Sequence, residues 1–169
     1  MILFTVDSLN QLSQGLVVRL ERHHDVKPKI LQGHVDHLFP NGVSRYGEFY
    51  LLRGSGNAAV SNPQIEILFE YVRRACYPDR PSRFQSFFAV ESIEIARVFR
   101  QQFCFGVGSI WQLTATKFFK ADMSLLSMGT SILSSSWFAH EYWKGNTGKA
   151  TFWEYLVIPP FKIDKMMEE

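Results

Sequence analysis

The sequence has few cysteines, and the two that it contains are far apart. Cys76 and Cys104 are the only cysteines among 169 residues. Neither belongs to a C-x-x-C pair, which excludes the common zinc and redox motifs, and two cysteines do not make the framework of a disulfide-rich secreted domain. Both lie in apolar or aromatic surroundings. We therefore predict two buried free thiols in a reducing compartment.

Long hydrophobic runs are also missing. No apolar stretch reaches about 18 residues, and the chain does not open with a basic segment followed by an apolar one. These absences predict a cytoplasmic protein with no membrane span and no signal peptide.

The glycine motifs that hold phosphates or activate a serine are absent as well. The sequence contains no G-x-G-x-x-G, G-x-x-x-x-G-K-[ST] or G-x-S-x-G, which removes Rossmann, P-loop and hydrolase-elbow sites from consideration. It also has no internal repeat. A net charge of +2 is too small to indicate nucleic-acid binding by itself, although it permits it. The length predicts one domain over residues 1–169.

Aromatic residues are abundant. They make up 15% of the chain, with 15 Phe. Such a surplus fills a core or lines a pocket that stacks flat rings.

The predicted elements are interspersed without strict alternation of strands and helices. Hydrophobic periodicity predicts helices over 63–76, 91–103 and 131–144, the first capped by Ser61 or Asn62 and the last closed by Gly145. A polar loop is expected over 23–42. Strands are expected over 2–6, 15–21, 47–54, 82–90, 108–123 and 150–158, the last stopped by Pro159-Pro160. We predict an α+β fold with a split, mostly antiparallel sheet.

One acid interrupts the most strand-like segment, Phe152 to Pro159. Strand alternation puts Glu154 on the same face as Phe152, Leu156 and Ile158, and both faces of the strand are largely apolar. Because an unpaired buried carboxylate is costly, Glu154 needs a partner, an open pocket or a ligand. An edge-strand acid or a salt-bridged acid fits this pattern equally well.

A second candidate is the segment YPDRPSRFQSFF over 77–88. Arg80 and Arg83 suit bidentate contact with phosphate, and Ser86 and Phe87 follow on the predicted strand. Together these residues could hold a dinucleotide. A basic loop followed by a core strand explains the same residues.

Histidines give a third candidate. His23, His24, His34 and His37 fall in the predicted loop, with a spacing that matches no common zinc pattern, so we predict no metal site. His140 and Glu141 lie at a helix end, where an acid–base pair is possible and a solvated helix terminus is the simpler interpretation.

In their order, these segments resemble the ADP-ribosyltransferase superfamily, and more narrowly a small bacterial and phage branch of it. The resemblance rests on FPNGVSRYGEFYL, IEILFEYVRRACYPDRPSRFQSFFAVESIEIA, FFKADM, AHEYWKG and FWEYL, which cover most of residues 38–157.

This resemblance implies an NAD-dependent transferase. In that superfamily NAD lies in a cleft between two halves of a split antiparallel sheet, and a late-strand Glu drives transfer; here that is Glu154. The middle-strand Ser is Ser86, beside Phe87, and Tyr142 from AHEYWKG joins the NAD-binding set. The first strand, ILFTVDS, lacks the family's Arg or His. Arg45 and Arg83 are the candidate substitutes.

The resemblance also bears on the acceptor. A Glu two residues before the catalytic one marks many arginine-modifying members, and here Phe152 stands there. This disfavours arginine as the acceptor. We therefore expect ADP-ribose to go to single-stranded RNA or DNA, with a protein side chain or water, in plain NAD hydrolysis, as the alternatives. The family also implies a toxin or defence effector held by an antitoxin or inhibitor protein.

The sequence is also compatible with two other functions. One is an inactive module that binds a nucleotide or RNA on the same fold, favoured by the missing first-strand Arg or His. The other is a ribonuclease that uses the histidines of 23–37.

Overall fold

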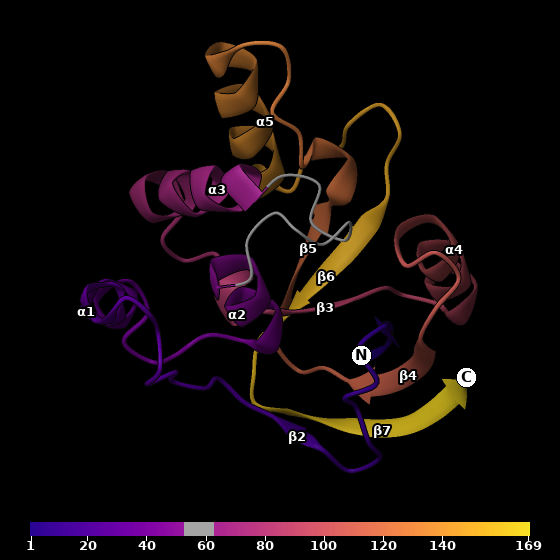
Figure 1. Ribbon diagram of the computed structural model, residues 1–169. Helices are drawn as coiled ribbons and strands as arrows, with labels where there is room; N and C mark the ends of the chain where they lie inside the picture. Colours follow the sequence, from indigo (N-terminus) through magenta and orange to yellow (C-terminus); the bar gives the residue numbers. More distant parts are fainter. Residues whose placement is uncertain (53–62) are drawn as a thin grey trace.

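A computed structural model of the chain describes residues 1–52 and 63–169. It contains two antiparallel sheets with helices around them (Figure 1). The larger sheet has the order β1-β4-β7-β2, formed by Ile2–Asp7, Ser109–Thr114, Phe161–Glu168 and Val17–Val18. The smaller has the order β3-β6-β5, formed by Phe87–Ala89, Trp153–Val157 and Phe118–Asp122. The predicted α+β fold with a split antiparallel sheet is confirmed.

The two sheets meet where β1 passes the end of β3. Phe4 N donates to Val90 O at 2.9 Å, and Val90 N donates to Phe4 O at 2.7 Å. The Thr5 hydroxyl adds a bond to the carbonyl of Phe88 at 2.9 Å. These three bonds fix the junction between the sheets, which is the place where a cleft was expected.

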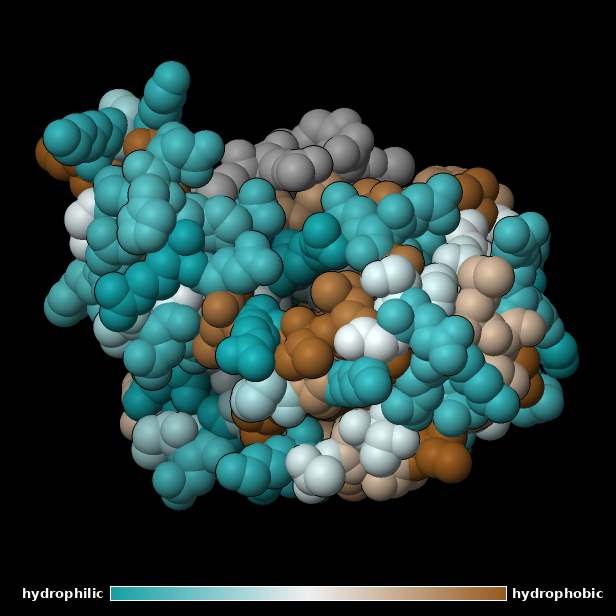
Figure 2. Space-filling model, turned by 90° about the horizontal axis from the view of Figure 1, so that it is seen from below, coloured by the Kyte–Doolittle hydropathy of each residue, from teal (hydrophilic) through white to brown (hydrophobic). Residues whose placement is uncertain are grey.

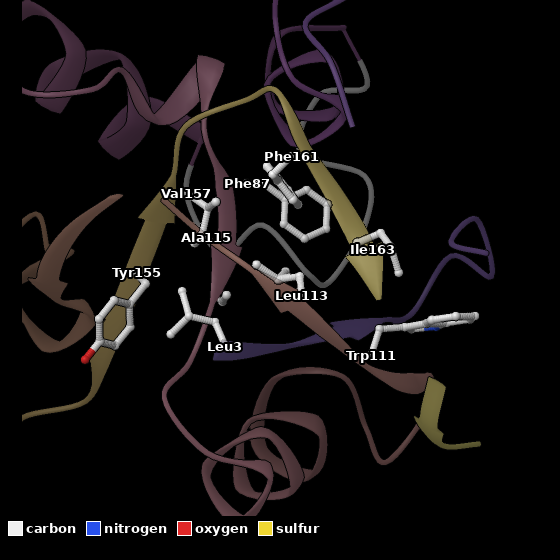
Figure 3. Packing of buried hydrophobic residues seen from close by; sticks show 10 residues of the cluster. Leu3, Phe87, Trp111, Leu113, Ala115, Tyr155, Val157, Phe161 and Ile163 are labelled. Carbon is white, nitrogen blue, oxygen red and sulfur yellow. The ribbon is translucent and has the colours of Figure 1, made fainter. Parts of the chain in front are cut away.

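A hydrophobic core fills the space between the sheets. Tyr155 and Val157 of β6 belong to one buried cluster with Leu113 of β4 and Ile163 of β7, and Figure 3 shows these residues. Burial of such side chains is the main favourable contribution to folding. Glu154 and Leu156 alternate with these residues, so they project from the opposite face of β6.

Two of the helices, α3 and α5, cover that opposite face. The described helices are α1 Lys29–Leu38, α2 Arg45–Leu52, α3 Pro63–Cys76, α4 Ile93–Phe103 and α5 Ile132–Lys144. Phe69 of α3 and Trp143 of α5 pack with Leu156 in one cluster, while Ala96 of α4 packs on Val6 of β1 in another. Glu154 therefore lies beneath α3 and α5, buried on a covered face.

Several predicted elements are confirmed. The helices expected over 63–76, 91–103 and 131–144 form, the second beginning at Ile93 and the third at Ile132, and Gly145 closes the last one with φ at +80°. The strand over 2–6 is β1, and the strand around Glu154 is β6. The predicted capping residues Ser61 and Asn62 lie outside the described residues.

Other predicted elements are wrong. The polar loop over 23–42 contains helix α1, and the strand over 47–54 is helix α2 in its described part. The single strand over 108–123 is two strands, β4 and β5, in different sheets. Of the strand predicted over 82–90, only β3 forms, and a 3₁₀ helix over Arg83–Gln85 precedes it. Of the strand predicted over 15–21, only the short β2 forms. A further strand, β7, also follows Pro159-Pro160, where no regular structure was predicted.

The surface adds two observations. The left side of Figure 2, where α1 lies, is mostly hydrophilic, and hydrophobic residues gather in the middle of the face shown. Among the described residues, no helix has the length and hydrophobicity needed to cross a bilayer.

Gly47 allows α2 to approach the segment that carries Arg83. A Cβ at Gly47 would lie 2.0 Å from the carbonyl oxygen of Phe84, which is backbone and cannot rotate away. We expect Gly47→Ala to lower the free energy of unfolding by about 1–3 kcal/mol, measured by urea denaturation.

Gly33 in α1 provides the matched control. A Cβ there meets nothing within 4 Å. Gly33→Ala should leave stability unchanged or raise it by about 0.5–1 kcal/mol through helix propensity. Equal effects of the two substitutions would show that the contact with Phe84 is unimportant.

Candidate functional site: a buried carboxylate in an aromatic pocket

A pocket of about 150 Å³ opens at the junction of the two sheets. Glu154 and Arg83 provide its charged groups. The rest of the lining is largely apolar and aromatic: Thr5, Val6, Ser8, Leu9, Tyr46, Phe49, Tyr50, Phe88, Ala89, Val90, Phe99, Phe103, Cys104 and Met123. One carboxylate among several flat rings suits a ligand with an aromatic ring and a centre of positive charge.

Glu154 is held rigidly at the wall of this pocket. It lies on β6, the middle strand of its sheet, opposite Ala121 of β5, and is 3% exposed. Its Oε1 accepts a hydrogen bond from Tyr142 Oη at 2.7 Å and another from Arg83 Nη1. The edge-strand interpretation of Glu154 is therefore wrong, and the salt-bridged interpretation is confirmed. Neither bond uses Oε2.

Arg83 connects Glu154 to a second buried acid. Its Nε and Nη2 donate to the two carboxylate oxygens of Glu66 at 2.7 and 3.1 Å, and its Nη1 donates also to Tyr142 Oη at 2.5 Å. The guanidinium carbon lies 4.6 Å from the centre of the Phe88 ring. Arg83 is 3% exposed and Glu66 7%. Two carboxylates thus share one guanidinium, with a phenol between them.

Burial sets the proton affinities of this cluster. It raises the pKa of Glu154 above the ordinary value, and the nearby Arg83 charge and the Tyr142 hydrogen bond offset only part of that effect. The pKa of Tyr142 lies well above its ordinary value because burial outweighs the attraction of Arg83. The two carboxylates more than compensate for the burial of Arg83, so its pKa is also raised and it stays charged.

Two other predicted NAD-binding residues border an adjoining hollow. Arg45, exposed at the start of α2, and Phe87 line it together with Asp7, and it shares Ser8, Leu9 and Tyr46 with the main pocket. Arg45 Nη1 makes a long bond of 3.4 Å to Gln11 O. Phe87 is also part of the core between the sheets.

Ser86 lies apart from both pockets. It is fully buried, and its hydroxyl donates to Ser82 O at 2.8 Å. Of the six predicted site residues, the structure thus brings Glu154, Arg83 and Tyr142 into one cluster, Arg45 and Phe87 to the adjoining hollow, and leaves Ser86 in the interior.

Phe152, two residues before Glu154, belongs to an aromatic cluster at the pocket. Its ring centre lies 6.2 Å from that of Phe99 and 5.8 Å from that of Phe103, and both partners line the pocket. The Phe152 ring is partly buried. Phe152 therefore packs on two rings of the pocket wall, although it does not line the pocket itself.

The remaining candidates do not converge. His140 Nδ1 contacts Tyr77 Oη at 3.0 Å, whereas Glu141 binds Lys144 and Asn146. In the described part of the chain, no three His, Cys, Asp or Glu side chains are grouped as a metal would require. The two cysteines are free, as predicted, but Cys76 is exposed and Cys104 is only partly buried, so the prediction of two buried thiols is wrong.

Asp122 anchors the chain just before β6. It is fully buried and accepts backbone hydrogen bonds from Ser124 at 2.9 Å, Gly148 at 2.7 Å and Phe152 at 2.9 Å. Burial would raise the pKa of Asp122, but these bonds outweigh burial and lower it. The bonds fix the entry of the strand that carries Glu154.

We expect Asp122→Asn to lose about 1–3 kcal/mol of stability, because its amide cannot accept all three bonds. Since the pKa of Asp122 is depressed in the folded state, its contribution is present above the unfolded pKa and is lost as the pH falls through the folded one. Urea denaturation at neutral and acidic pH should therefore show a smaller difference from wild type in acid. A difference that is constant with pH would contradict this role.

Sequence reasoning missed several residues of the site. Glu66 is one, since an acid on the polar side of an amphipathic helix has an ordinary explanation. Tyr46 and Tyr50 are others, because Tyr50 lies in the segment predicted as a strand over 47–54 and Tyr46 directly precedes it. Thr5 was identified only as part of a first strand that lacks Arg or His. The signal that could have pointed to Glu66 was its position four residues before Glu70, which is also buried.

Comparison with known protein families gives one match. Residues 50–169 match a family described as "Protein of unknown function (DUF2441)". The chain belongs to this family. The matched range includes Glu66, Arg83, Tyr142 and Glu154, whereas Arg45 and β1 precede it. No curated protein matches the chain.

Proposed function

We propose that this DUF2441 protein is an NAD-dependent ADP-ribosyltransferase with Glu154 as its catalytic residue. The observation that carries the proposal is a buried carboxylate, fixed by Arg83 and Tyr142, that faces an aromatic pocket at the junction of two antiparallel sheets. The resemblance described above leads us to expect this location for the NAD cleft.

The residues present suit NAD as the substrate. The main pocket has room for a ring and part of its ribose, and its aromatic walls can stack nicotinamide. The rest of the dinucleotide would extend over the adjoining hollow, where the exposed Arg45 can pair with the diphosphate.

The reaction follows from this arrangement. The bond between nicotinamide and ribose C1′ breaks, its electron pair leaves with neutral nicotinamide, and positive charge develops on the ribose. Glu154, hydrogen-bonded to a ribose hydroxyl, stabilises that charge as it grows. A nucleophile of the acceptor then forms a bond to C1′ and loses its proton to solvent.

The acceptor that we favour is single-stranded nucleic acid. Phe152 and its aromatic partners Phe99 and Phe103 offer flat surfaces beside the pocket, on which a base could stack. A protein side chain is the other candidate. A cytoplasmic toxin or defence effector controlled by an inhibitor protein is the context that the resemblance implies.

The test is a transfer assay with NAD labelled in its adenosine half. The protein is incubated with this NAD and cellular RNA, DNA or protein, beside Glu154→Gln and Ser86→Ala variants. Label should appear in one acceptor class, and Glu154→Gln should abolish it. Binding of NAD without turnover would instead indicate the inactive binding module, and RNA cleavage that ignores NAD but fails in histidine variants would indicate the ribonuclease.

A further inference from the structure

We infer that Glu66 and Arg83 form a fixed unit that positions Glu154, and that Arg83 acts through this carboxylate without contacting the bound dinucleotide. The inference rests on the proposed function for its kinetic readout, and a second readout needs no substrate. It assigns roles to two residues that are hydrogen-bonded to each other, Glu66 on α3 and Arg83 on the 3₁₀ helix.

The contacts of Arg83 are all directed into the protein. Each of its three guanidinium nitrogens donates to a buried partner: Nε and Nη2 to Glu66, and Nη1 to Tyr142 and Glu154. The rings of Phe88 and Tyr142 lie 4.6 and 5.4 Å from its guanidinium carbon. To reach a diphosphate, Arg83 would have to leave two buried carboxylates unpaired, which is costly.

Arg45 offers the contrast. It is exposed, borders the adjoining hollow and makes one long bond, to Gln11 O. An arginine in this state can pair with phosphate at little cost. We therefore assign diphosphate contact to Arg45 and carboxylate positioning to Arg83.

Glu66 has a specific part in this arrangement. If Arg83 were paired with Glu154 alone, it would neutralise the charge that the transition state requires. Glu66 takes two of the guanidinium's hydrogen bonds, so the two carboxylates together outweigh one cation. Because Glu154 Oε1 receives the bonds from Arg83 and Tyr142, the carboxylate is fixed with its other oxygen, Oε2, available to the substrate.

The charged and titratable groups around Glu154 come from several elements. They are Arg83 on the 3₁₀ helix, Tyr142 on α5, Glu66 on α3, Tyr46 and Tyr50 on α2 and, across the pocket, Cys104 after α4. Burial raises the pKa of Tyr50 and of Cys104, which keeps both neutral near neutral pH. Beyond burial, Arg83, Tyr142 and Glu66 are therefore the groups that shift the proton affinity of Glu154.

The kinetic test compares Arg83→Lys, Glu66→Gln and Arg45→Gln. Lysine keeps the charge of Arg83 but cannot make the bidentate bond. We expect Arg83→Lys and Glu66→Gln to lower kcat at least about tenfold with little change in the KM for NAD, and Arg45→Gln to raise KM with kcat nearly unchanged. A raised KM with normal kcat in Arg83→Lys would overturn the inference.

The pH dependence gives opposite signs for two neighbours. Activity requires ionised Glu154, so kcat should rise with pH through the pKa of Glu154. The negative charge of Glu66 raises the pKa of Glu154, so Glu66→Gln should move the rise in kcat to lower pH. The hydrogen bond from Tyr142 lowers the pKa of Glu154, so Tyr142→Phe should move the rise in kcat to higher pH. If both residues had a purely structural role, neither substitution would change the pH at which kcat rises.

The second readout is an NMR titration of the Glu154 side-chain carboxyl carbon without NAD. The same opposite shifts of the Glu154 titration are expected in Glu66→Gln and Tyr142→Phe. If wild type has no transferase activity, the proposed function fails, and this titration still decides whether the unit controls Glu154. Identical titrations in wild type and both variants would refute it.

Discussion

Glu154→Gln should reduce the rate of NAD turnover by about 10²–10³-fold while NAD binding is retained. The substitution keeps the size of the side chain and an oxygen for Arg83 and Tyr142, but it removes the negative charge that faces the developing cation. Loss of one preorganised electrostatic group in a site closed to water typically has an effect of this size. The measurement is kcat from nicotinamide release, with the Kd for NAD from calorimetry.

A matched control distinguishes this effect from a general loss of charge. Glu94 is exposed in the first turn of α4, away from the buried cluster. Glu94→Gln removes the same charge and should leave kcat and Kd unchanged. Turnover that persists in Glu154→Gln would exclude this carboxylate as the catalytic group.

The second large effect concerns stability. Arg83→Met should lower the free energy of unfolding by about 3–5 kcal/mol at neutral pH, because Glu66 and Glu154 then remain buried without a counter-charge. The measure is the urea midpoint together with its slope.

The pH dependence of that loss has a definite sign. Burial already raises the pKa of Glu154, and without the charge of Arg83 that folded-state pKa rises further above the unfolded value of about 4.3. A carboxyl with a raised folded-state pKa favours folding below the unfolded pKa, and this contribution disappears as the pH rises. The defect of Arg83→Met should therefore be small in acid and grow toward neutral pH.

Two further variants test the cause. Arg97→Met breaks the exposed pair with Glu168 and should have little effect. Adding Glu66→Gln and Glu154→Gln to Arg83→Met removes the unpaired charges and should restore part of the lost stability. A defect that is the same at every pH, or that the triple variant does not relieve, would contradict the account.

The fold was predictable from sequence where the local pattern and the tertiary environment agree. Helix α3 has apolar residues at helical spacing, and β6 is a run of aromatic and aliphatic residues, so both were found. Helix α2 was not, because its aromatic residues favour strands locally. In the folded protein Gly47 lets this segment pack as a helix against the backbone of Phe84.

Two other elements were missed for different reasons. The polar residues of α1 concealed the helical spacing of Leu31, Val35 and Leu38. The two prolines before β7 suggested an end to the chain's regular structure, although Phe161 and Ile163 alternate with polar residues as in a half-buried strand.

The candidate site was predictable only in part. Glu154 stands out because a single acid in an apolar strand needs a reason. Its connection to Glu66 through Arg83 depends on how α3 and the 3₁₀ helix pack, and no periodicity contains that information. The same holds for Ser86, whose hydroxyl is used by the backbone of Ser82.

The most direct test of the central claim counts both products of one reaction. Purified wild type and Glu154→Gln are incubated with adenosine-labelled NAD and fractionated cellular RNA, DNA and protein, and released nicotinamide is compared with label bound to acceptor. We expect equal amounts of both products in wild type and about 10²–10³-fold less of each in Glu154→Gln. No nicotinamide release by wild type with any fraction, or equal release by both proteins, would contradict the central claim.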